Sequence, residues 1–549
     1  MCRSNSYFKD KYERFELEDK IEELNKEQNE LLKENHNLKK ENKYLKSSKA
    51  YKLFESYLKL RNEYKSNNIK KSDEIKNLKD IKVAVIFDQF TYDSYKYEFT
   101  PISLLPDIWR EQFEEEKPDL FFCESAWDGH DFEGLYGPWR DKISKDYEAD
   151  GENRTILFDI IKYCRKNSIP TIFWNKEDPP HYRNEKISYA ETAKEFDYIF
   201  TSSENCIKHY KKDFNHKHVY SLMFAGQPKL FNPLNLSDST IDEIAFAGSY
   251  YSNHPQRAKL MEDIFDRLIE DGQKLLIFNR LYYKNWGAYP ERYNEFVNPP
   301  IDYKETPLLY KKMKWGLNFN IVTDSRTMFA RRMFELALSN VNILTNYALG
   351  VDEIFKDNVF VFDKTDDLPD FNEDYEEKRL NNLYNVLENH TYTKRWKQIL
   401  DTIGFEYSED EKHVDVIYEI SSSGEIDSCL DNFNKIDYPQ KTLKILINSS
   451  SGDIKKKLDE IGEIYYTNDI FKLKENISSE FWILVDGKIN PDFIKKAVLH
   501  YQYLNKRVSI CEGENKFSIG ETKKIENKLI HKINLDFLTN SQKIDVYYI

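Results

Sequence analysis

The sequence predicts an α/β protein with two Rossmann-like domains that face a cleft, a coiled-coil helix before them and a small α/β accessory domain after them. Three observations predict this fold class. Leucine recurs every seventh position near the N-terminus, short apolar strands alternate with helical segments from Ile81 onward, and 549 residues exceed what one hydrophobic core can hold. We expect a dimerisation stalk at 1–50, a helical connector at 51–80, an N-terminal Rossmann-like domain at 81–228, a C-terminal Rossmann-like domain at 229–410 and an accessory domain at 411–549.

Composition and charge argue against several classes of function. The formal net charge of -14 argues against a nucleic-acid partner, although local basic runs such as Lys455 to Lys457 remain. The 6 cysteines show no metal or redox spacing, and nothing at the N-terminus resembles a signal peptide. The sequence contains no run of about 18 apolar residues, so we expect no transmembrane segment. We therefore expect a cytoplasmic protein, and peripheral contact with the inner face of the membrane stays open.

The first 50 residues carry a heptad pattern. Five leucines occupy the d positions, and the intervening a positions are Ile21, Gln28, Asn35 and Asn42. Leucine at d with asparagine at a is typical of a parallel two-stranded coiled coil, in which the asparagine fixes the register. The pattern predicts a homodimer, and the alternative is one long polar helix packed on its own domain. The d-position leucines are Leu17, Leu24, Leu31, Leu38 and Leu45.

The first Rossmann-like domain is predicted from βα repetition that begins at Lys82. The apolar segments 82–88 and 118–124 both read as strands that end in a carboxylate, Asp88 and Glu124. Repetition of this kind indicates a doubly wound parallel sheet, whose ligands lie beyond the carboxyl ends of the strands. Asp88, Glu124 and the turn at 175–179 are therefore expected to meet at one crevice.

The second Rossmann-like domain restarts at Asp242. A strand runs into Gly248 and Ser249, a helix follows over 256–270, and further strands are expected at 275–280 and 315–320. A glycine after the first strand permits close approach of the backbone to a phosphate, although a lone Gly-Ser is more often only a turn.

The segment 324–344 predicts a loop, a helix, a left-handed stop at Asn340 and a buried strand. The start of such a helix offers free N–H groups to an anion, with Ser325 and Thr327 as further donors and Arg326, Arg331 or Arg332 as charge partners. Glu335 then lies on a face that could reach the sugar hydroxyls of a nucleotide. The alternative is an ordinary N-cap followed by a solvated helix face with an i, i+4 ion pair.

Several separate motifs in the right order are similar to the CgeB-like (DUF3880-type, spore-maturation) family of glycosyltransferases, which have the GT-B fold. The similarity covers roughly 81–362. It departs from the family where Leu338 replaces the usual Ala and Asn340 the usual Gly. The motif residues are Glu124 to Trp127, Phe173 to Pro179, Phe196 to Thr201, Phe246 to Tyr250, Arg257, Arg332, Phe334, Glu335, Asn346, Tyr347, Leu349 and Gly350.

The resemblance implies a hexosyl- or N-acetylhexosaminyltransferase that uses a nucleotide sugar, with UDP as the expected nucleotide. The acceptor would be a cell-surface or spore glycan, a teichoic-acid-type polymer or a protein, and no cofactor or metal is expected. The candidate catalytic bases are Glu124 first, then Asp88 and Glu177, with Asp178, His130 and His181 behind them. The candidate donor-binding residues are Gly248, Ser249, Arg257, Asn279, Ser325, Arg326, Thr327, Arg332 and Glu335.

Two other functions stay open. One is a non-catalytic scaffold that keeps the transferase fold to bind a glycan or a protein, and the other is a nucleotide-sugar epimerase of the same fold. The choice between inverting and retaining transfer also stays open.

The last 139 residues resemble the opening of an A-type glycosyltransferase domain. Asp486 falls where that fold places its metal-binding acidic motif, but the second carboxylate that a divalent ion needs is missing. We therefore expect a degenerate accessory domain without a catalytic metal.

Overall fold

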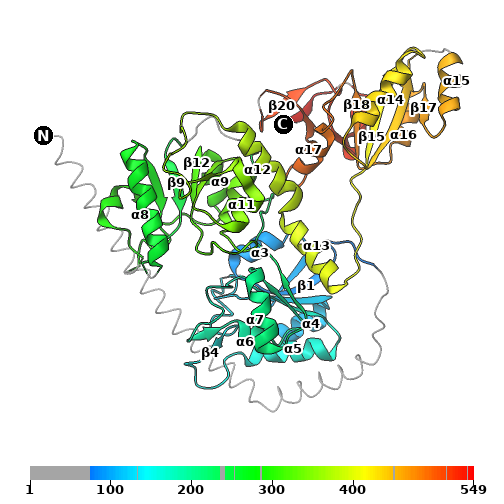
Figure 1. Ribbon diagram of the computed structural model, residues 1–549. Coiled ribbons are helices and arrows are strands. Elements are labelled where there is room, and N and C mark those ends of the chain that lie inside the picture. The colour runs from blue at the N-terminus through cyan, green and yellow to red at the C-terminus, as the bar shows by residue number, and fades with distance from the viewer. Residues whose placement is uncertain are drawn as a thin grey trace. The chain divides into compact units, whose positions relative to one another are not determined.

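The computed structural model describes residues 75–132, 134–234, 241–252, 254–284, 287–448, 452–514, 516–540 and 542–549 (Figure 1). The predicted coiled coil and all but the last residues of the predicted helical connector lie outside these ranges. Within them the chain forms three main β-sheets, and the strands of each sheet come from a separate stretch of the sequence.

The first sheet is parallel throughout, with the strand order β2-β1-β3-β5-β7-β8. Its strands are β1 (Lys82–Ile86), β2 (Thr100–Ser103), β3 (Leu120–Glu124), β5 (Thr171–Asn175), β7 (Tyr198–Thr201) and β8 (Val219–Ser221). Its helices are α3 (Gln89–Tyr95), α4 (Trp109–Glu116), α5 (Thr155–Lys166), α6 (Ala190–Ala193) and α7 (Glu204–Phe214), and β4 (Lys145–Asp146) pairs with β6 (Ile187–Ser188) in a separate ribbon.

Burial on both faces explains why these strands read as continuous apolar runs. Every residue of β3 and β5 is buried, with one hydrophobic cluster on each side of the sheet. Leu104 and Leu105 lie outside helix α4, which begins only at Trp109, because Pro106 disfavours helical geometry at the residue before it. The N–H of Leu104 instead donates to the carbonyl of Val85, which continues the pairing of β2 with β1.

The second sheet is also parallel throughout, with the order β11-β10-β9-β12-β13-β14. Its strands are β9 (Ile244–Ala247), β10 (Leu275–Phe278), β11 (Val297–Asn298), β12 (Trp315–Asn318), β13 (Asn342–Thr345) and β14 (Phe360–Val361). Its helices are α8 (Pro255–Glu270), α9 (Thr306–Lys312), α10 (Arg332–Leu338) and α11 (Leu349–Phe355), with the 3-10 turns η1 (Glu291–Phe296) and η2 (Lys356–Asn358).

Each of these two sheets has a point at which the strand order reverses. In the first sheet β2 lies on one side of β1. The chain then crosses to the other side of β1, where β3, β5, β7 and β8 follow in order. In the second sheet the same reversal separates β9 from β12. Ligands of open α/β sheets bind beyond the carboxyl ends of the strands at such a point. A ligand is therefore expected at the carboxyl ends of β1 and β3 in the first sheet and of β9 and β12 in the second.

Two helices follow the second sheet, α12 (Glu376–Asn389) and α13 (Tyr392–Ile403), and the second of them returns to the first sheet (Figure 1). The buried guanidinium of Arg395 donates to the carbonyls of Met223 and Phe224, and Gln398 donates to the carbonyl of Ser221. These contacts attach α13 to the segment that leaves β8. The segment 376–403 thus forms two helices, which are separated at 390–391.

The third part of the chain forms the sheet β17-β16-β15-β18-β21, which is parallel except for β21, and a smaller sheet, β19-β22-β20. The strands are β15 (Val414–Ile420), β16 (Lys441–Ile447), β17 (Tyr465–Thr467), β18 (Phe481–Val485), β19 (Ser509–Cys511), β20 (Ile519–Thr522), β21 (Ile530–His531) and β22 (Ile544–Tyr548). The helices are α14 (Glu425–Lys435), α15 (Gly452–Ile461), α16 (Ile470–Asn476) and α17 (Phe493–His500), with the 3-10 turn η3 (Lys532–Leu538).

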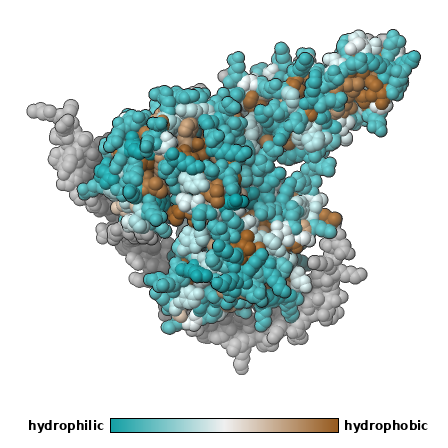
Figure 2. Space-filling view, viewed as in Figure 1, coloured by the Kyte–Doolittle hydropathy of each residue, from teal (hydrophilic) through white to brown (hydrophobic). Residues whose placement is uncertain are grey.

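The face of the molecule seen in Figure 2 is mostly hydrophilic, and hydrophobic residues form small separate groups on it. Among the helices of the described residues, none has both the length and the apolar character needed to cross a membrane.

Candidate functional site

Two arginines meet at the strand reversal of the second sheet. Arg332, the first residue of α10, donates from its guanidinium to the carbonyl of Ala247 at the end of β9, and its Nη1 lies 3.5 Å from Oδ1 of Asn318 at the end of β12. Arg257, in the first turn of α8, donates to the carbonyl of Ser249 at 3.0 Å. Both positive charges therefore lie beside the carboxyl ends of β9 and β12, where a ligand of this sheet is expected.

Neither charge is neutralised within the described part of the chain. No carboxylate there lies within ion-pair distance of Arg257 or Arg332, and their hydrogen bonds go to neutral carbonyl, amide and hydroxyl oxygens. Burial lowers the pKa of Arg257 to about 10, and the neighbouring charge of Arg332 acts in the same direction. An anion beside the two groups would relieve this repulsion, so the pair is an electropositive centre suited to a phosphate or diphosphate.

Buried polar atoms without partners lie around the same pair. Ser249 is buried, and among the described residues neither its hydroxyl nor the Nε of Arg257 has a hydrogen-bond partner. An unsatisfied buried donor costs roughly 1 to 3 kcal/mol, so such atoms are unusual unless a ligand or water completes them. Ser249 and Arg257, both expected to bind the donor, therefore offer free donors at the expected place.

Glu335 has a partner that the sequence suggested only as an alternative. Its Oε1 lies 3.5 Å from Nε of Arg331, at i, i+4 spacing, and its side chain is buried instead of solvated. The guanidinium of Arg331 also stacks over Phe90 at 4.0 Å and over Tyr303 at 5.0 Å, and its Nη1 has no hydrogen bond. Glu335 thus lies buried in the first turn of α10, and the predicted bond to a ribose stays a prediction.

The helix start that was expected to seat a phosphate is arranged differently. The helix begins at Arg332 and not near Ser325, and the carboxylate of Glu204 already accepts the N–H groups of Arg326 at 2.7 Å and of Thr327 at 3.0 Å. The hydroxyl of Ser325 donates to the same carboxylate at 2.7 Å. The segment Ser325–Thr327 does bind an anion, but the anion is a side chain that opens α7 of the first sheet.

Arg326 is separate from the arginine pair as well. Its side chain is exposed and forms an ion pair with Glu353 at 3.2 Å. The left-handed stop at Asn340 is confirmed, with a φ of 58°, and the buried strand β13 follows it as expected.

Gly248 and Asn279 have structural reasons for their identities. A Cβ at Gly248 would lie 2.4 Å from the ring of Phe246, so packing against that ring already requires glycine, whatever approaches from outside. The amide of Asn279 is buried and satisfied, because it donates to the carbonyl of Gly287 and accepts the N–H of Leu281. Asn279 therefore shapes the loop after β10 and presents no free group.

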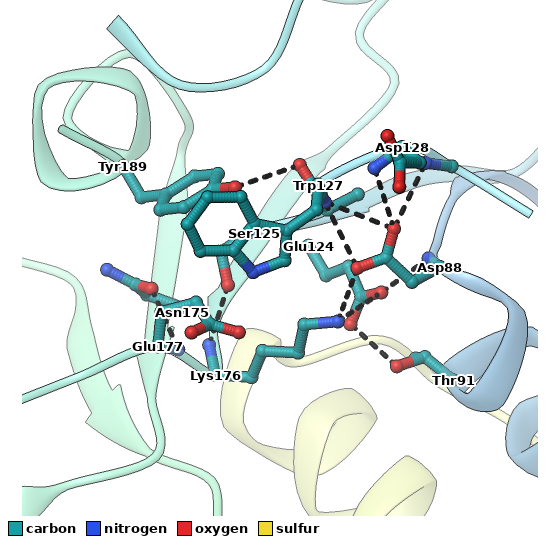
Figure 3. A network of polar contacts seen from close by, with 12 residues as sticks. Asp88, Thr91, Glu124, Ser125, Trp127, Asp128, Asn175, Lys176, Glu177 and Tyr189 are labelled. Atoms are coloured by element: carbon teal, nitrogen blue, oxygen red, sulfur yellow. Dashed lines mark hydrogen bonds and ion pairs between the residues drawn. The ribbon is translucent and has the colours of Figure 1, made fainter. Parts of the chain in front are cut away.

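The strand reversal of the first sheet holds a network of opposite charges (Figure 3). Asp88, Glu124 and the turn that contains Lys176 do meet, as expected. The ammonium of Lys176 lies 2.7 Å from Asp88 and 3.1 Å from Glu124 and is itself buried. The carboxylate of Asp88 also accepts the N–H groups of Trp127 at 3.1 Å and of Gly129 at 3.0 Å.

Glu124 is the most enclosed member of the network. Its carboxylate is fully buried and accepts the N–H of Asp88 at 2.6 Å and the hydroxyl of Thr91 at 2.7 Å. Burial raises the pKa of Glu124, against the opposing effect of Lys176, and the pKa of Asp88 is lowered because the ammonium and the N–H groups outweigh its burial. A substrate hydroxyl has no access to Glu124 in this arrangement, so the network holds the loops after β1, β3 and β5 together.

Glu177 is the more accessible of the expected bases. Its carboxylate is partly exposed, and His181 lies 3.9 Å from it at i, i+4 spacing. The ring of Trp127, 43% exposed, meets the ring of His181 edge to face at 5.6 Å. Glu177, His181 and Trp127 thus form a partly open corner beside the buried network. The remaining candidate bases, Asp178 and His130, are enclosed. Asp178 is fully buried and accepts a hydrogen bond from the hydroxyl of Thr201, and the ring of His130 stacks on the ring of Tyr92.

Phe90 connects the two strand reversals. Its ring lies 4.2 Å from the ammonium of Lys176 and 4.0 Å from the guanidinium of Arg331, so it contacts one cation from each sheet. The sequence analysis missed Phe90, the role of Lys176 and the role of Glu204. A signal existed for Glu204, because it opens a helix directly after a strand, which places it at the carboxyl edge of the sheet. No signal existed for Phe90, since its contacts join segments about 86 and 241 positions away along the chain.

Within the described residues, no group of three or more His, Cys, Asp or Glu side chains is arranged to hold a metal ion.

Residues 256–401 match the family model described as glycosyl transferase-like, so this part of the chain is a glycosyltransferase-like domain. The matched segment contains Arg257, Arg332 and Glu335. No curated protein sequence matches the chain. The α/β architecture of two parallel sheets is the kind that the GT-B resemblance implied.

Three solved structures align with part of the chain at low sequence identity and low TM-score. An alpha-glucosyltransferase in complex with UDP and a 13-mer DNA aligns at 10% identity and a TM-score of 0.41, covering 59% of this chain and 100% of that one. An alpha1,3-fucosyltransferase aligns at 13% identity and a TM-score of 0.31, covering 61% of this chain and 92% of that one. A UDP-N-acetylglucosamine 2-epimerase aligns at 10% identity and a TM-score of 0.30, covering 60% of this chain and 99% of that one.

Proposed function

We propose that the protein is a glycosyltransferase that moves a sugar from a nucleotide-sugar donor, with UDP as its nucleotide, to a glycan, a teichoic-acid-type polymer or a protein. The observation that carries the proposal is the pair of unneutralised arginines, Arg257 and Arg332, beside the ends of β9 and β12. The pair lies inside the segment that matches the glycosyl transferase-like family model.

The chemistry explains why two arginines suit this place. When the bond between the sugar and the diphosphate breaks, negative charge grows on the departing diphosphate, and fixed cations that meet this charge lower the barrier. Arg332 is oriented by the carbonyl of Ala247, and the carbonyl of Ser249 orients Arg257, so both groups are positioned before the ligand arrives. Two guanidinium groups supply the stabilisation that a divalent ion supplies in other transferases, and we infer that transfer here needs no metal.

On the acceptor side we infer that Glu177 is the general base, if the reaction inverts the sugar configuration. Of the expected bases, Glu177 is partly exposed, whereas Asp88 and Glu124 are held by Lys176. The exposed ring of Trp127 beside it offers a flat apolar surface against which a sugar ring can pack. A glycan acceptor fits this combination of a carboxylate and an aromatic face.

The donor prediction is tested by calorimetry on the full-length protein with UDP, GDP and ADP, followed by hydrolysis of the matching nucleotide sugars with and without EDTA. We expect UDP to bind, a UDP-sugar to be hydrolysed slowly without an acceptor, and EDTA to change neither result. Absence of binding to all three nucleotides would contradict the proposal. A strict requirement for Mg²⁺ or Mn²⁺ would contradict metal-independent transfer.

A second candidate function is a non-catalytic binding protein that retains the transferase fold. The observation in its favour is the pairing of both Asp88 and Glu124 with Lys176, together with the full burial of Glu124, which leaves the first two expected bases poorly placed to reach a substrate. The same experiment separates the two functions, because a scaffold of this kind would bind a nucleotide or a glycan without any turnover of nucleotide sugars.

We also propose that the protein is a homodimer, on the heptad pattern of residues 17–45. Removal of the first 48 residues should halve the mass measured by light scattering and leave UDP binding unchanged. An unchanged mass would contradict the dimer without affecting the proposal for the donor.

A further inference from the structure

The loop after β3 exposes two aromatic side chains on the acceptor side of the proposed site. Trp127 is 43% exposed and Tyr136 is 77% exposed. None of the described residues forms a hydrogen bond with the hydroxyl of Tyr136 or stacks against its ring. Binding residues are often found on loops that a rigid sheet positions, and exposed aromatic side chains grouped on such a loop indicate an interaction surface.

The two aromatic residues extend from neighbouring parts of this loop. The N–H of Trp139 donates to the carbonyl of Asp128 at 2.9 Å, and a Cβ at Gly137 would lie 3.5 Å from the Cβ of Asp128. Trp127 directly precedes Asp128, and Tyr136 directly precedes Gly137. Because consecutive Cα atoms are about 3.8 Å apart, the Cα atoms of Trp127 and Tyr136 are at most about 14 Å apart. Two linked rings of one chain can therefore reach both side chains.

An ion pair between Asp128 and Arg140 lies beside the two aromatic residues. The Nε of Arg140 donates to the carboxylate of Asp128 at 2.6 Å, and both side chains are more than half exposed. A Cβ at Gly137 would lie 3.2 Å from Nη2 of Arg140, so glycine at this position lets the guanidinium lie against the backbone. A carboxylate and a guanidinium held in this way present acceptors and donors to the hydroxyl groups of a sugar.

Contacts within the first sheet hold this loop in place (Figure 3). The carboxylate of Asp88 accepts the N–H groups of Trp127 at 3.1 Å and of Gly129 at 3.0 Å. The ring of Trp127 meets the rings of His181 and Tyr189 edge to face at 5.6 and 5.5 Å. The surface is therefore formed before a ligand arrives, which reduces the entropy lost on binding.

The charges of the loop argue against an anionic partner. The segment 127–147 has more carboxylates than cations, and the guanidinium of Arg140 is already paired with Asp128. The carboxylates are Asp128, Asp131, Glu133, Asp141 and Asp146, and the cations are Arg140, Lys142 and Lys145. A phosphodiester polymer would therefore meet net negative charge here, whereas a neutral glycan would not.

We propose that this loop surface binds a neutral glycan chain of two or more sugars as the acceptor. The first ring packs on Trp127, on the side of Glu177, and the next ring packs on Tyr136. Hydroxyl groups at the edges of the rings meet Asp128 and Arg140, because a sugar has apolar C–H faces and a polar rim. This assignment rests on the proposed transferase function, and it narrows the acceptor to a neutral glycan.

The experiment tests the full-length protein on an array of neutral glycans, from mono- to hexasaccharides, with poly(glycerol phosphate) as the anionic comparison. We expect binding to chains of two or more sugars and no binding to poly(glycerol phosphate). Binding to the anionic polymer alone, or to no neutral oligosaccharide, would overturn the proposal.

Two variants place the bound chain on the loop. Calorimetry with the tightest-binding oligosaccharide should show about tenfold weaker binding for Trp127→Ala and for Tyr136→Ala, since each variant loses the apolar surface under one ring. Phe471→Ala is the matched control, because it removes an aromatic ring that is 64% exposed on α16 of the third sheet. Unchanged affinity in Tyr136→Ala, or an equal loss in the control, would contradict the assignment to this loop.

UDP binding and UDP-sugar hydrolysis by the same preparation separate this proposal from the transferase function. Turnover of a UDP-sugar without binding to any neutral glycan would remove the loop surface and leave the transferase function in place. Glycan binding that depends on Tyr136, without turnover of nucleotide sugars, would keep the surface and favour the non-catalytic binding protein.

Discussion

Both Rossmann-like sheets have charged groups at their strand reversals. The charges are paired in the first sheet and unpaired in the second. At the ends of β1 and β3, the ammonium of Lys176 lies within 3.1 Å of two carboxylates, and backbone N–H groups complete the network. At the ends of β9 and β12, Arg257 and Arg332 lie together without any carboxylate among the described residues. The two clusters thus occupy the same position in the fold, and they differ in whether their charges have partners of opposite sign.

This difference separates a structural network from a ligand site. Buried charges are costly unless they are paired, so a cluster in which each carboxylate contacts a cation and hydrogen-bond donors needs nothing further to be stable. Like charges without partners keep an electrostatic cost that a ligand of opposite charge can remove. The free energy recovered in this way contributes to ligand binding. We therefore expect changes in the first cluster to alter stability and changes in the second cluster to alter nucleotide binding and turnover.

The largest effect is expected from Lys176→Met. The substitution leaves two buried carboxylates without their cation, so the free energy of unfolding should fall by about 3 to 5 kcal/mol. Chemical denaturation monitored by circular dichroism measures this change. Arg257→Met is the matched comparison, because it removes a buried cation that has no carboxylate partner, and it should cost much less stability. A similar loss in both variants would contradict the distinction between the clusters.

The second effect concerns turnover. Arg332→Ala should lower the hydrolysis or transfer rate about 10² to 10³-fold, since the lost charge acts on the departing diphosphate. UDP binding should weaken less than turnover does. Arg292→Ala is the control, because Arg292 is paired with Glu262 and Asp266 on the surface. Steady-state kinetics that show the same rates for the Arg332 variant and the parent would remove Arg332 from the donor site.

The third prediction concerns Glu335, which either binds the ribose or serves only as the ion-pair partner of Arg331. If Glu335 binds the ribose hydroxyls, Glu335→Gln should weaken UDP binding roughly tenfold or more, because a carboxylate acceptor bond contributes about 1.5 to 3 kcal/mol. If it serves only as the partner of Arg331, the variant should lose stability and keep its affinity for UDP. Calorimetry together with thermal unfolding separates the two outcomes, and we expect the first.

The smallest effect is expected from Glu204→Gln. The carboxylate accepts N–H groups from Arg326 and Thr327 and the hydroxyl of Ser325, so its neutralisation should lower the free energy of unfolding by about 1 to 2 kcal/mol. UDP affinity should stay as in the parent protein. If affinity rises instead, Glu204 occupies a place that the phosphates would take, and Ser325 to Thr327 belong to the donor site after all.

The sequence alone determined the elements and their order. The buried parallel strands were predictable because both of their faces must be apolar, and β3 lies within the segment 118–124 as expected, with every residue buried. The stop at Asn340 was predictable because few residues other than glycine tolerate a left-handed backbone, and the φ of 58° confirms it. The meeting of Asp88 and Glu124 followed from topology alone, since strand ends of a parallel sheet share one edge.

Only the tertiary structure decided which charges are paired. The partners of Asp88 and of the segment Ser325–Thr327 come from distant parts of the chain, and one of them, Glu204, opens a helix of the first sheet. A carboxylate at the end of a strand reads alike in sequence whether a lysine neutralises it or a substrate meets it. Side-chain pairing depends on distances of a few ångströms between segments that local pattern does not relate, and for that reason the fold was predictable and the charge balance of the two sites was not.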